Sequence, residues 1–189
     1  IVPELIEKFF QKPLQPGHPV SLKCVAKGTP KPQISWYLDE TPVVRTGRII
    51  VADFVNTDGA VVSYVNISNV QVEDGGNYEC VARNGAGTAA YVERVDVYGL
   101  PFVRPFRNIT VVAKKTMIVH CHVAGYPIDS IHWEKDSRRL PFNHRQKVHN
   151  NGTLQIRNLD DKEDEGVYTC VARNNRSQSA RAYFYANVK

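Results

Sequence analysis

The length of 189 residues fits one or two domains. No apolar run reaches the roughly 18 residues that a membrane-spanning helix needs, so the sequence predicts no such helix. The net charge of +5 is a weak indication of function by itself, because an excess of one sign is often only a solvated surface.

Alternation of apolar and polar residues predicts β-strands along the whole chain. In the stretch VSLKC, residues 20–24, Val20, Leu22 and Cys24 fall on one face and the intervening residues on the other. The stretches VNISNV, MIVHC and LQIRNL behave in the same way. Turn sequences such as NTDG, NGAG and NNG separate them, and no stretch has a long helical period.

The two halves of the chain share one motif, Asp-x-Gly-x-Tyr-x-Cys, and each half has an earlier Cys and Trp. The shared positions are Cys24, Trp36, Tyr78 and Cys80 in the first half, and Cys121, Trp133, Tyr168 and Cys170 in the second. In immunoglobulin-like sandwiches, such cysteines join strands B and F, the Trp packs on the disulfide, and the Tyr forms a corner before strand F.

The fold class predicted from this repeat is all-β, with two tandem immunoglobulin-like sandwiches of the I-set type. The predicted domains are residues 1–99 and 100–189, each with one disulfide, Cys24–Cys80 and Cys121–Cys170. A zinc site at these cysteines is disfavoured, because the chain has no Cys-x-x-Cys pair. Asp74 and Asp164 are expected to pair with Arg48 and Arg145.

Paired cysteines favour an oxidising compartment, and the sequons agree with secretion. Four Asn-x-Ser/Thr sequons are candidate glycosylation sites: Asn66, Asn108, Asn151 and Asn175. The chain has no initiator Met and no signal peptide, so we expect a piece of a longer extracellular protein whose membrane anchor lies outside it.

The charge is concentrated in the second half. Residues 1–99 have nine Lys or Arg and eleven Asp or Glu, whereas residues 100–189 have fifteen and eight. Attraction to sulfated glycans or to an acidic partner is one interpretation of this excess, with Lys114, Lys115, Arg138 and Arg139 as candidate contacts. A merely solvated surface is the alternative. The secreted character disfavours a nucleic-acid partner.

No catalytic motif or phosphate-binding loop is present, so the sequence predicts a protein that is not an enzyme and has no cofactor. His120 and His122 alternate with Cys121 and are expected to point away from the core, on the same face as His149. Two such imidazoles can share a metal, but surface histidines on a sheet are the preferred interpretation, and no metal site is predicted.

The second half also contains VAGYPID, WEKD, RQKV and NGTL in that order, and the first contains LQPGHPVSLKC and VSYVNISNVQVEDGG. These stretches resemble the Down syndrome cell adhesion molecule (Dscam) family, of an arthropod type, over essentially the whole chain. The two units look like the sixth and seventh immunoglobulin domains of that family. One departure is His122, which stands where the family more often has proline.

The resemblance implies a single-pass neuronal cell-surface receptor that acts by homophilic recognition. Its implied roles are self-avoidance, axon guidance and dendrite patterning. It also implies alternative splicing of the seventh-type domain in insects, and a symmetric homodimer through that domain. A structural spacer that binds sulfated glycans or another ligand through the basic second domain is the alternative function.

The predicted strands indicate which face would self-associate. Asn66 is expected to point outward from the middle of strand E, the stretch VNISNV. A glycan there would oppose close contact of this face of the first domain with a sheet of another molecule. The corresponding face of the second domain has no sequon at its centre and an exposed Ile. Its candidate interface residues are Thr116, Ile118, His120, His122, Lys147, His149, Gln155 and Arg157.

Overall fold

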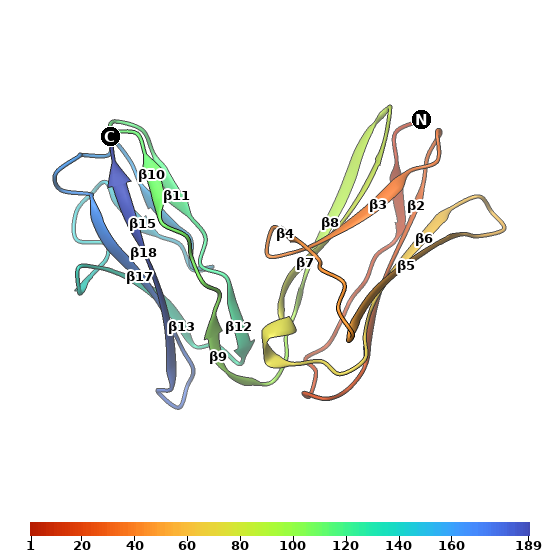
Figure 1. Ribbon diagram of the computed structural model, residues 1–189, viewed down its shortest axis with the longest axis horizontal. Helices are drawn as coiled ribbons and strands as arrows, with labels where there is room; N and C mark the ends of the chain where they lie inside the picture. The colour runs from red at the N-terminus through yellow and green to blue at the C-terminus, as the bar shows by residue number, and fades with distance from the viewer. The chain divides into compact units, whose positions relative to one another are not determined.

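Residues 1–189 are all described by a computed structural model, which contains β-strands and one short 3-10 turn, Val72–Asp74. Contacts between residues divide the chain into two units, Ile1–Tyr98 and Gly99–Lys189. Figure 1 shows that, apart from that turn, all the regular secondary structure of each unit is β-strand. Gly99 opens the first strand of the second unit and pairs with Tyr126, so it belongs with that unit.

The first unit contains two four-stranded sheets. The strands of one sheet are, in order, β1 (Glu4–Glu7), β2 (Val20–Lys27), β6 (Val61–Ile67) and β5 (Ile49–Val55). Those of the other are β4 (Thr41–Pro42), β3 (Gln33–Leu38), β7 (Gly76–Asn84) and β8 (Gly87–Val95). All of these neighbours pair antiparallel, as expected for a sandwich built from hairpins and crossovers.

The core of the first unit lies between its sheets. The disulfide Cys24–Cys80 joins β2 to β7, with 6.6 Å between the two Cα atoms. Trp36 on β3 and Tyr78 on β7 are buried beside it. The buried indole nitrogen of Trp36 donates a hydrogen bond of 2.8 Å to the hydroxyl of Ser63, which in turn donates to the carboxylate of Asp53.

The second unit repeats this architecture with more interruptions. Its five-stranded sheet is β10 (Ile109–Val111), β18 (Ser179–Val188), β17 (Gly166–Arg173), β13 (Ser130–Lys135) and β14 (Arg138–Arg139). The facing strands form two smaller sheets: β11 (Met117–Val119), β16 (Leu154–Ile156) and β15 (Gln146–Val148), and β12 (Val123–Tyr126) with β9 (Gly99–Val103).

The core of the second unit is centred on Trp133, which is fully buried. The disulfide Cys121–Cys170 lies within the same cluster, with 6.4 Å between its Cα atoms. Here the indole nitrogen donates 2.7 Å to the backbone oxygen of Gly152. The two disulfides and the two all-β sandwiches confirm the fold class predicted from the repeat of Cys, Trp, Tyr and Cys.

Both units also form the expected tyrosine corner. The hydroxyl of Tyr78 donates to the backbone oxygen of Asp74, and that of Tyr168 donates 2.6 Å to the backbone oxygen of Asp164. Each tyrosine is buried, and this bond gives its hydroxyl a backbone acceptor inside the sandwich.

The strand predicted to contain MIVHC is shorter than expected. It pairs with β16 only as far as Val119, and β12 then pairs with β9 in a separate sheet. A register shift in β12 falls at Gly125, whose φ of +93° suits glycine. A Cβ there would collide with the backbone oxygen of Leu100, so the close pairing of β12 with β9 depends on this glycine.

Candidate interaction surface

The outward face of β11, β16 and β15 in the second unit contains most of the predicted interface. Ile118, Gln155 and Lys147 lie side by side in one row across the three strands. Their side chains share a face because paired residues of neighbouring strands point the same way. Ile118, the middle residue of the edge strand β11, is 57% exposed.

The histidines lie just beyond the ends of these strands, not within them. The Nδ1 atom of His120 is 2.9 Å from the hydroxyl of Thr153, and Nε2 of His149 is 3.3 Å from Oε1 of Gln155. The rings of His120 and His122 are 6.1 Å apart. The structure therefore brings the three imidazoles to one end of the face, although strand pairing stops at Val119 and Val148.

The opposite end of the face is formed by Thr116 and Arg157. Both are exposed, and each lies one residue outside its strand. One terminal nitrogen of Arg157 donates a hydrogen bond of 3.2 Å to the backbone oxygen of His144, which restricts the position of this guanidinium. None of the three strands contains Asp or Glu, so the charged groups of the face are basic.

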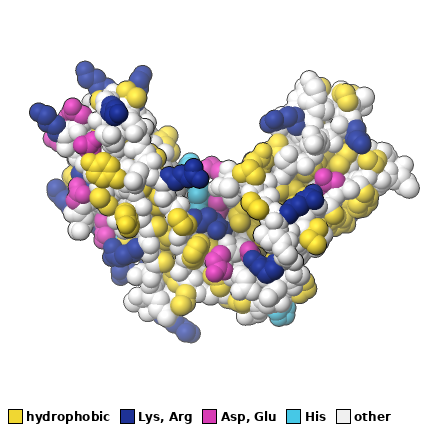
Figure 2. Space-filling view, in the orientation of Figure 1, with side chains coloured by type: hydrophobic (Ala, Val, Ile, Leu, Met, Phe, Trp, Pro, Cys, Tyr) yellow, Lys and Arg dark blue, Asp and Glu magenta, His cyan; other side chains and the backbone are white.

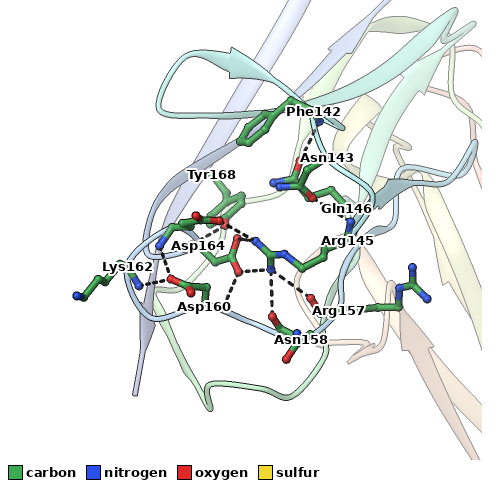
Figure 3. A network of polar contacts seen from close by, with 11 residues as sticks. Phe142, Asn143, Arg145, Gln146, Arg157, Asn158, Asp160, Lys162, Asp164 and Tyr168 are labelled. Carbon is green, nitrogen blue, oxygen red and sulfur yellow. Dashed lines mark hydrogen bonds and ion pairs between the residues drawn. The ribbon is translucent and has the colours of Figure 1, made fainter.

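An ion pair anchors the edge of this face (Figure 3). Arg145, just before β15, forms a bidentate ion pair with the carboxylate of Asp164, with one N–O distance of 3.1 Å. It also donates to the backbone oxygens of Arg157 and Asn158 at 3.2 and 3.1 Å. The hydrogen bond to Asp164 raises the pKa of Arg145, so this guanidinium stays charged. This pairing was predicted from the sequence.

The first unit has the matching pair, also as predicted. The guanidinium of Arg48 lies 2.8 and 3.2 Å from the two carboxylate oxygens of Asp74. The side chain of Arg48 is 37% exposed, whereas that of Arg145 is 14% exposed. The two pairs are the same in geometry but differ in their access to water.

The outward face of the first unit contains a group of apolar side chains. Val25, Ala60 and Val62 form a small buried cluster there, separate from the main core. Phe54 on β5 is 52% exposed and stacks on Tyr64 with 6.2 Å between the ring centroids. Figure 2 shows hydrophobic side chains at the surface over β5 and β6.

The sequon asparagines have different surroundings. Asn66 points outward as expected but is the penultimate residue of β6, not its middle, and its Oδ1 accepts a hydrogen bond from Ser21. A glycan there would cover the end of the sheet. Asn108 precedes β10, Asn151 lies in the turn between β15 and β16, and Asn175 lies in the turn between β17 and β18.

The basic residues proposed to contact polyanions are spread over different elements. Lys114 and Lys115 lie in the turn before β11, and Arg138 and Arg139 form β14 in the other sheet. The guanidinium of Arg138 sits 3.9 Å from the ring centroid of Phe142. On the visible side of the second unit, Lys and Arg side chains are scattered, not gathered into one patch (Figure 2).

The remaining chemistry of the chain is limited. The structure holds no group of three or more His, Cys, Asp or Glu side chains able to bind a metal ion. All four cysteines are in disulfides. No helix has the length and apolar character needed to cross a membrane.

Comparison with known proteins decides the family. The model of the immunoglobulin domain matches residues 3–84 and 102–174, which is most of each unit. The chain belongs to the immunoglobulin domain family. Immunoglobulin domains of cell adhesion molecules are not enzymes, which agrees with the lack of a catalytic motif.

The similarity to Dscam proteins is much closer than to immunoglobulin domains in general. Cell adhesion molecule Dscam2 of Drosophila melanogaster is 48% identical over 95% of the chain, and cell adhesion molecule DSCAM of Gallus gallus is 49% identical over 89%. The crystal structure of the N-terminal eight immunoglobulin domains of a DSCAM isoform matches with a TM-score of 0.90 and 46% identity over 98% of the chain. The resemblance to the Dscam family is confirmed.

The chain spans only a small part of these relatives. It covers 9% of the Dscam2 sequence, 8% of the chicken DSCAM sequence and 24% of the crystallised eight-domain fragment. The activities and partners of the whole receptors are therefore considered for this chain as proposals.

Proposed function

We propose that the chain is part of the extracellular region of a single-pass neuronal adhesion receptor of an arthropod. The relatives that it resembles are named cell adhesion molecules, and its two disulfides suit an oxidising, extracellular environment. The first and second units are proposed to be the sixth-type and seventh-type domains. The receptor would act in self-avoidance, axon guidance and dendrite patterning, with splice variants of the second domain.

Within this receptor, the second unit is proposed to bind a second copy of itself through the outward face of β11, β16 and β15. The observation that carries this proposal is the exposure of Ile118 in the central row with Gln155 and Lys147. A symmetric dimer uses the same patch on both copies, so an apolar centre with polar neighbours can complement itself.

The charge of the face restricts how two copies can meet. Lys147 and Arg157 have no carboxylate partner on these strands, and like charges placed opposite each other weaken binding. The two-fold axis is therefore expected to pass near Ile118, with the cations displaced from it. Hydrogen bonds from Gln155 and the imidazoles would then surround the apolar contact.

Sedimentation equilibrium on the glycosylated two-domain chain tests this function, from low micromolar to about millimolar protein, a range that covers weak adhesion contacts. Ile118→Asp is expected to weaken dimerisation at least tenfold, because a carboxylate would be buried at the contact. Ile50→Asp is the matched control, since Ile50 is 56% exposed on the corresponding sheet of the first unit. It is expected to leave association unchanged.

Two results would count against this surface. An Ile118→Asp variant that dimerises like the parent chain would remove the proposed face. A parent chain that is monomeric throughout would mean that this pair alone does not self-associate, and that recognition requires neighbouring domains acting together.

The second candidate is a spacer that binds sulfated glycans or an acidic ligand. It is favoured by the excess of Lys and Arg in the second unit and by the lack of carboxylates on β11, β15 and β16. Retention on heparin should then fall when Lys114, Lys115, Arg138 and Arg139 are replaced by Gln, and should decrease with salt. Elution of the parent chain at low salt would contradict it.

A further inference from the structure

The second unit has an exposed aromatic patch on the face of its five-stranded sheet. Tyr183 and Tyr185 on β18 are 70% and 42% exposed, and Val167, which pairs with Tyr185, is 37% exposed. These side chains point the same way, since the two tyrosines alternate along one strand and Val167 faces Tyr185 across the ladder. Exposed aromatic side chains of this kind commonly lie under a binding partner.

A sequon asparagine lies directly beside the patch. Asn108 precedes β10, which pairs in parallel with β18 so that Ile109 lies opposite Ala186. The Oδ1 atom of Asn108 accepts a hydrogen bond of 2.8 Å from the backbone nitrogen of Tyr185. This bond fixes the carboxamide of Asn108 next to the strand that holds both tyrosines.

The geometry of an N-glycosidic bond points a sugar toward this strand. Linkage converts the Asn108 side chain into a secondary amide, which strongly prefers the trans arrangement. The anomeric carbon on Nδ2 then lies opposite Cβ and on the same side as Oδ1. Because Oδ1 faces the backbone of Tyr185, the first sugar begins its course beside β18.

We propose that Asn108 carries an N-linked glycan whose first N-acetylglucosamine covers Tyr185 and Tyr183. The Nδ2 atom forms a bond to the anomeric carbon and loses one proton, while a lipid pyrophosphate leaves the lipid-linked oligosaccharide donor of the secretory pathway. The apolar C–H face of the sugar packs on the rings and removes them from water. This inference relies on the extracellular location in the proposed function.

The glycan also assigns different tasks to the two faces of the second unit. A sugar over the five-stranded sheet prevents close contact of that sheet with another protein. The face of β11, β16 and β15 has no sequon asparagine on its strands and stays open. The covalent occupant is favoured over a protein partner at the tyrosines because Asn108 is held against Tyr185.

The test uses the full chain secreted from eukaryotic cells. Mass spectrometry of the peptide containing Asn108 is expected to show the glycan, and nuclear magnetic resonance is expected to show Overhauser contacts between the first sugar and the ring of Tyr185. Thr110→Ala removes the sequon but leaves Asn108 and its hydrogen bond intact, whereas Thr110→Ser keeps the sequon. Only the alanine variant should lose the sugar and the contacts.

Thermal unfolding of the second unit provides a second measurement. Thr110→Ala is expected to lower its midpoint by about 2 to 4 °C relative to Thr110→Ser, a shift of the size that modest losses cause in a small domain. With Tyr183→Ala and Tyr185→Ala already present, the same comparison should show no difference. Asn175→Gln, which removes another exposed sequon, should not change the midpoint.

The inference would be overturned by an unmodified Asn108 in a chain whose other sequons carry sugar. It would equally be overturned by a glycan at Asn108 that makes no contact with the tyrosine rings. Neither result bears on self-association, which is measured separately with Ile118→Asp. Absence of sugar from all four sequons would contradict the inference and the extracellular location together.

Discussion

The two units have the same Asp–Arg–Tyr arrangement at one corner, but different acceptors for the indole N–H of the core Trp. Just before β7 and β17, each unit has a buried Asp whose carboxylate binds an Arg side chain. The backbone oxygen of the same Asp accepts a hydrogen bond from a Tyr hydroxyl. At the core Trp, the first unit uses the Ser63 hydroxyl and the second uses the backbone oxygen of Gly152. The fold requires an acceptor for each buried indole N–H, but it does not require a particular residue.

The outward faces differ more than the cores. In the first unit, β5 exposes Phe54 beside Tyr64, whereas the corresponding face of the second unit has an isolated Ile118 among basic and imidazole side chains. Residues that face the core are restricted by the sandwich, and residues that face solvent are free to differ. Function is therefore expected to be found in the outward rows, where the two copies of the fold have diverged.

The largest expected effect distinguishes the two Asp–Arg pairs. Asp164→Ala should destabilise the second unit by about 3 to 5 kcal/mol, because it leaves the largely buried Arg145 without its partner. Asp74→Ala should cost the first unit less, because water reaches Arg48. Each unit has one Trp, so fluorine resonances of fluorotryptophan can follow the two unfolding transitions separately.

Arg145→Met and Arg48→Met serve as controls for this comparison, since they leave a carboxylate and not a guanidinium without its partner. Asp164→Ala should exceed Asp74→Ala in both chemical and thermal unfolding. Equal losses in the two units would show that exposure of the Arg does not set the strength of the pair.

An intermediate effect is expected at the Trp hydrogen bond of the first unit. Ser63→Ala leaves the buried N–H of Trp36 without an acceptor and should cost about 1 to 3 kcal/mol. Asp53→Asn keeps an oxygen for the Ser63 hydroxyl and should cost less. The second unit has no equivalent side chain to remove, because its acceptor is the backbone oxygen of Gly152. A neutral Ser63→Ala would mean that another group satisfies the indole.

The smallest effect concerns pH. Burial lowers the pKa of His132, and the Arg139 and Arg173 guanidinium groups act in the same direction, whereas Glu134 opposes them. The unfolded chain therefore binds the proton first as the pH falls below about 6.5, so stability of the second unit should decrease from that pH down to the folded-state pKa.

The first unit provides the comparison for this pH effect, because Ser35 precedes Trp36 where His132 precedes Trp133. Its unfolding should show no corresponding loss from this position. In the second unit, His132→Gln should flatten the dependence between pH 7 and 5, as followed by the fluorotryptophan resonance. An unchanged pH profile in that variant would assign the loss to other groups.

The sequence was sufficient for the features that the core imposes. Alternating residues such as Leu22 and Cys24 predicted inward positions correctly, and the spacing of Cys, Trp and Tyr predicted both disulfides. The Asp–Arg pairs followed from the same repeat. These features depend on burial with period two, which a sequence displays directly.

Features that depend on strand endings and on pairing across the sheet could not be predicted in this way. Alternation alone does not reveal that pairing with β16 stops at Val119 and that the chain then pairs with β9 from Val123. The position of Asn66 near the end of β6 depends on where pairing with β2 stops. The bond between Asn108 and Tyr185 joins residues far apart in the chain, and only the parallel pairing of β10 with β18 brings them together.

That parallel pairing has a mechanical consequence. Force on an adhesion receptor is transmitted along the chain, so it pulls β10 toward its beginning and β18 toward its end. Three residue pairs, from Ile109–Ala186 to Val111–Val188, would then be loaded in shear and must yield together. The first unit has a single parallel bridge at the equivalent place, Leu14 with Val97. In the adhesion receptor proposed above, the second unit would resist tension better than the first, so its outward face would keep its shape under load.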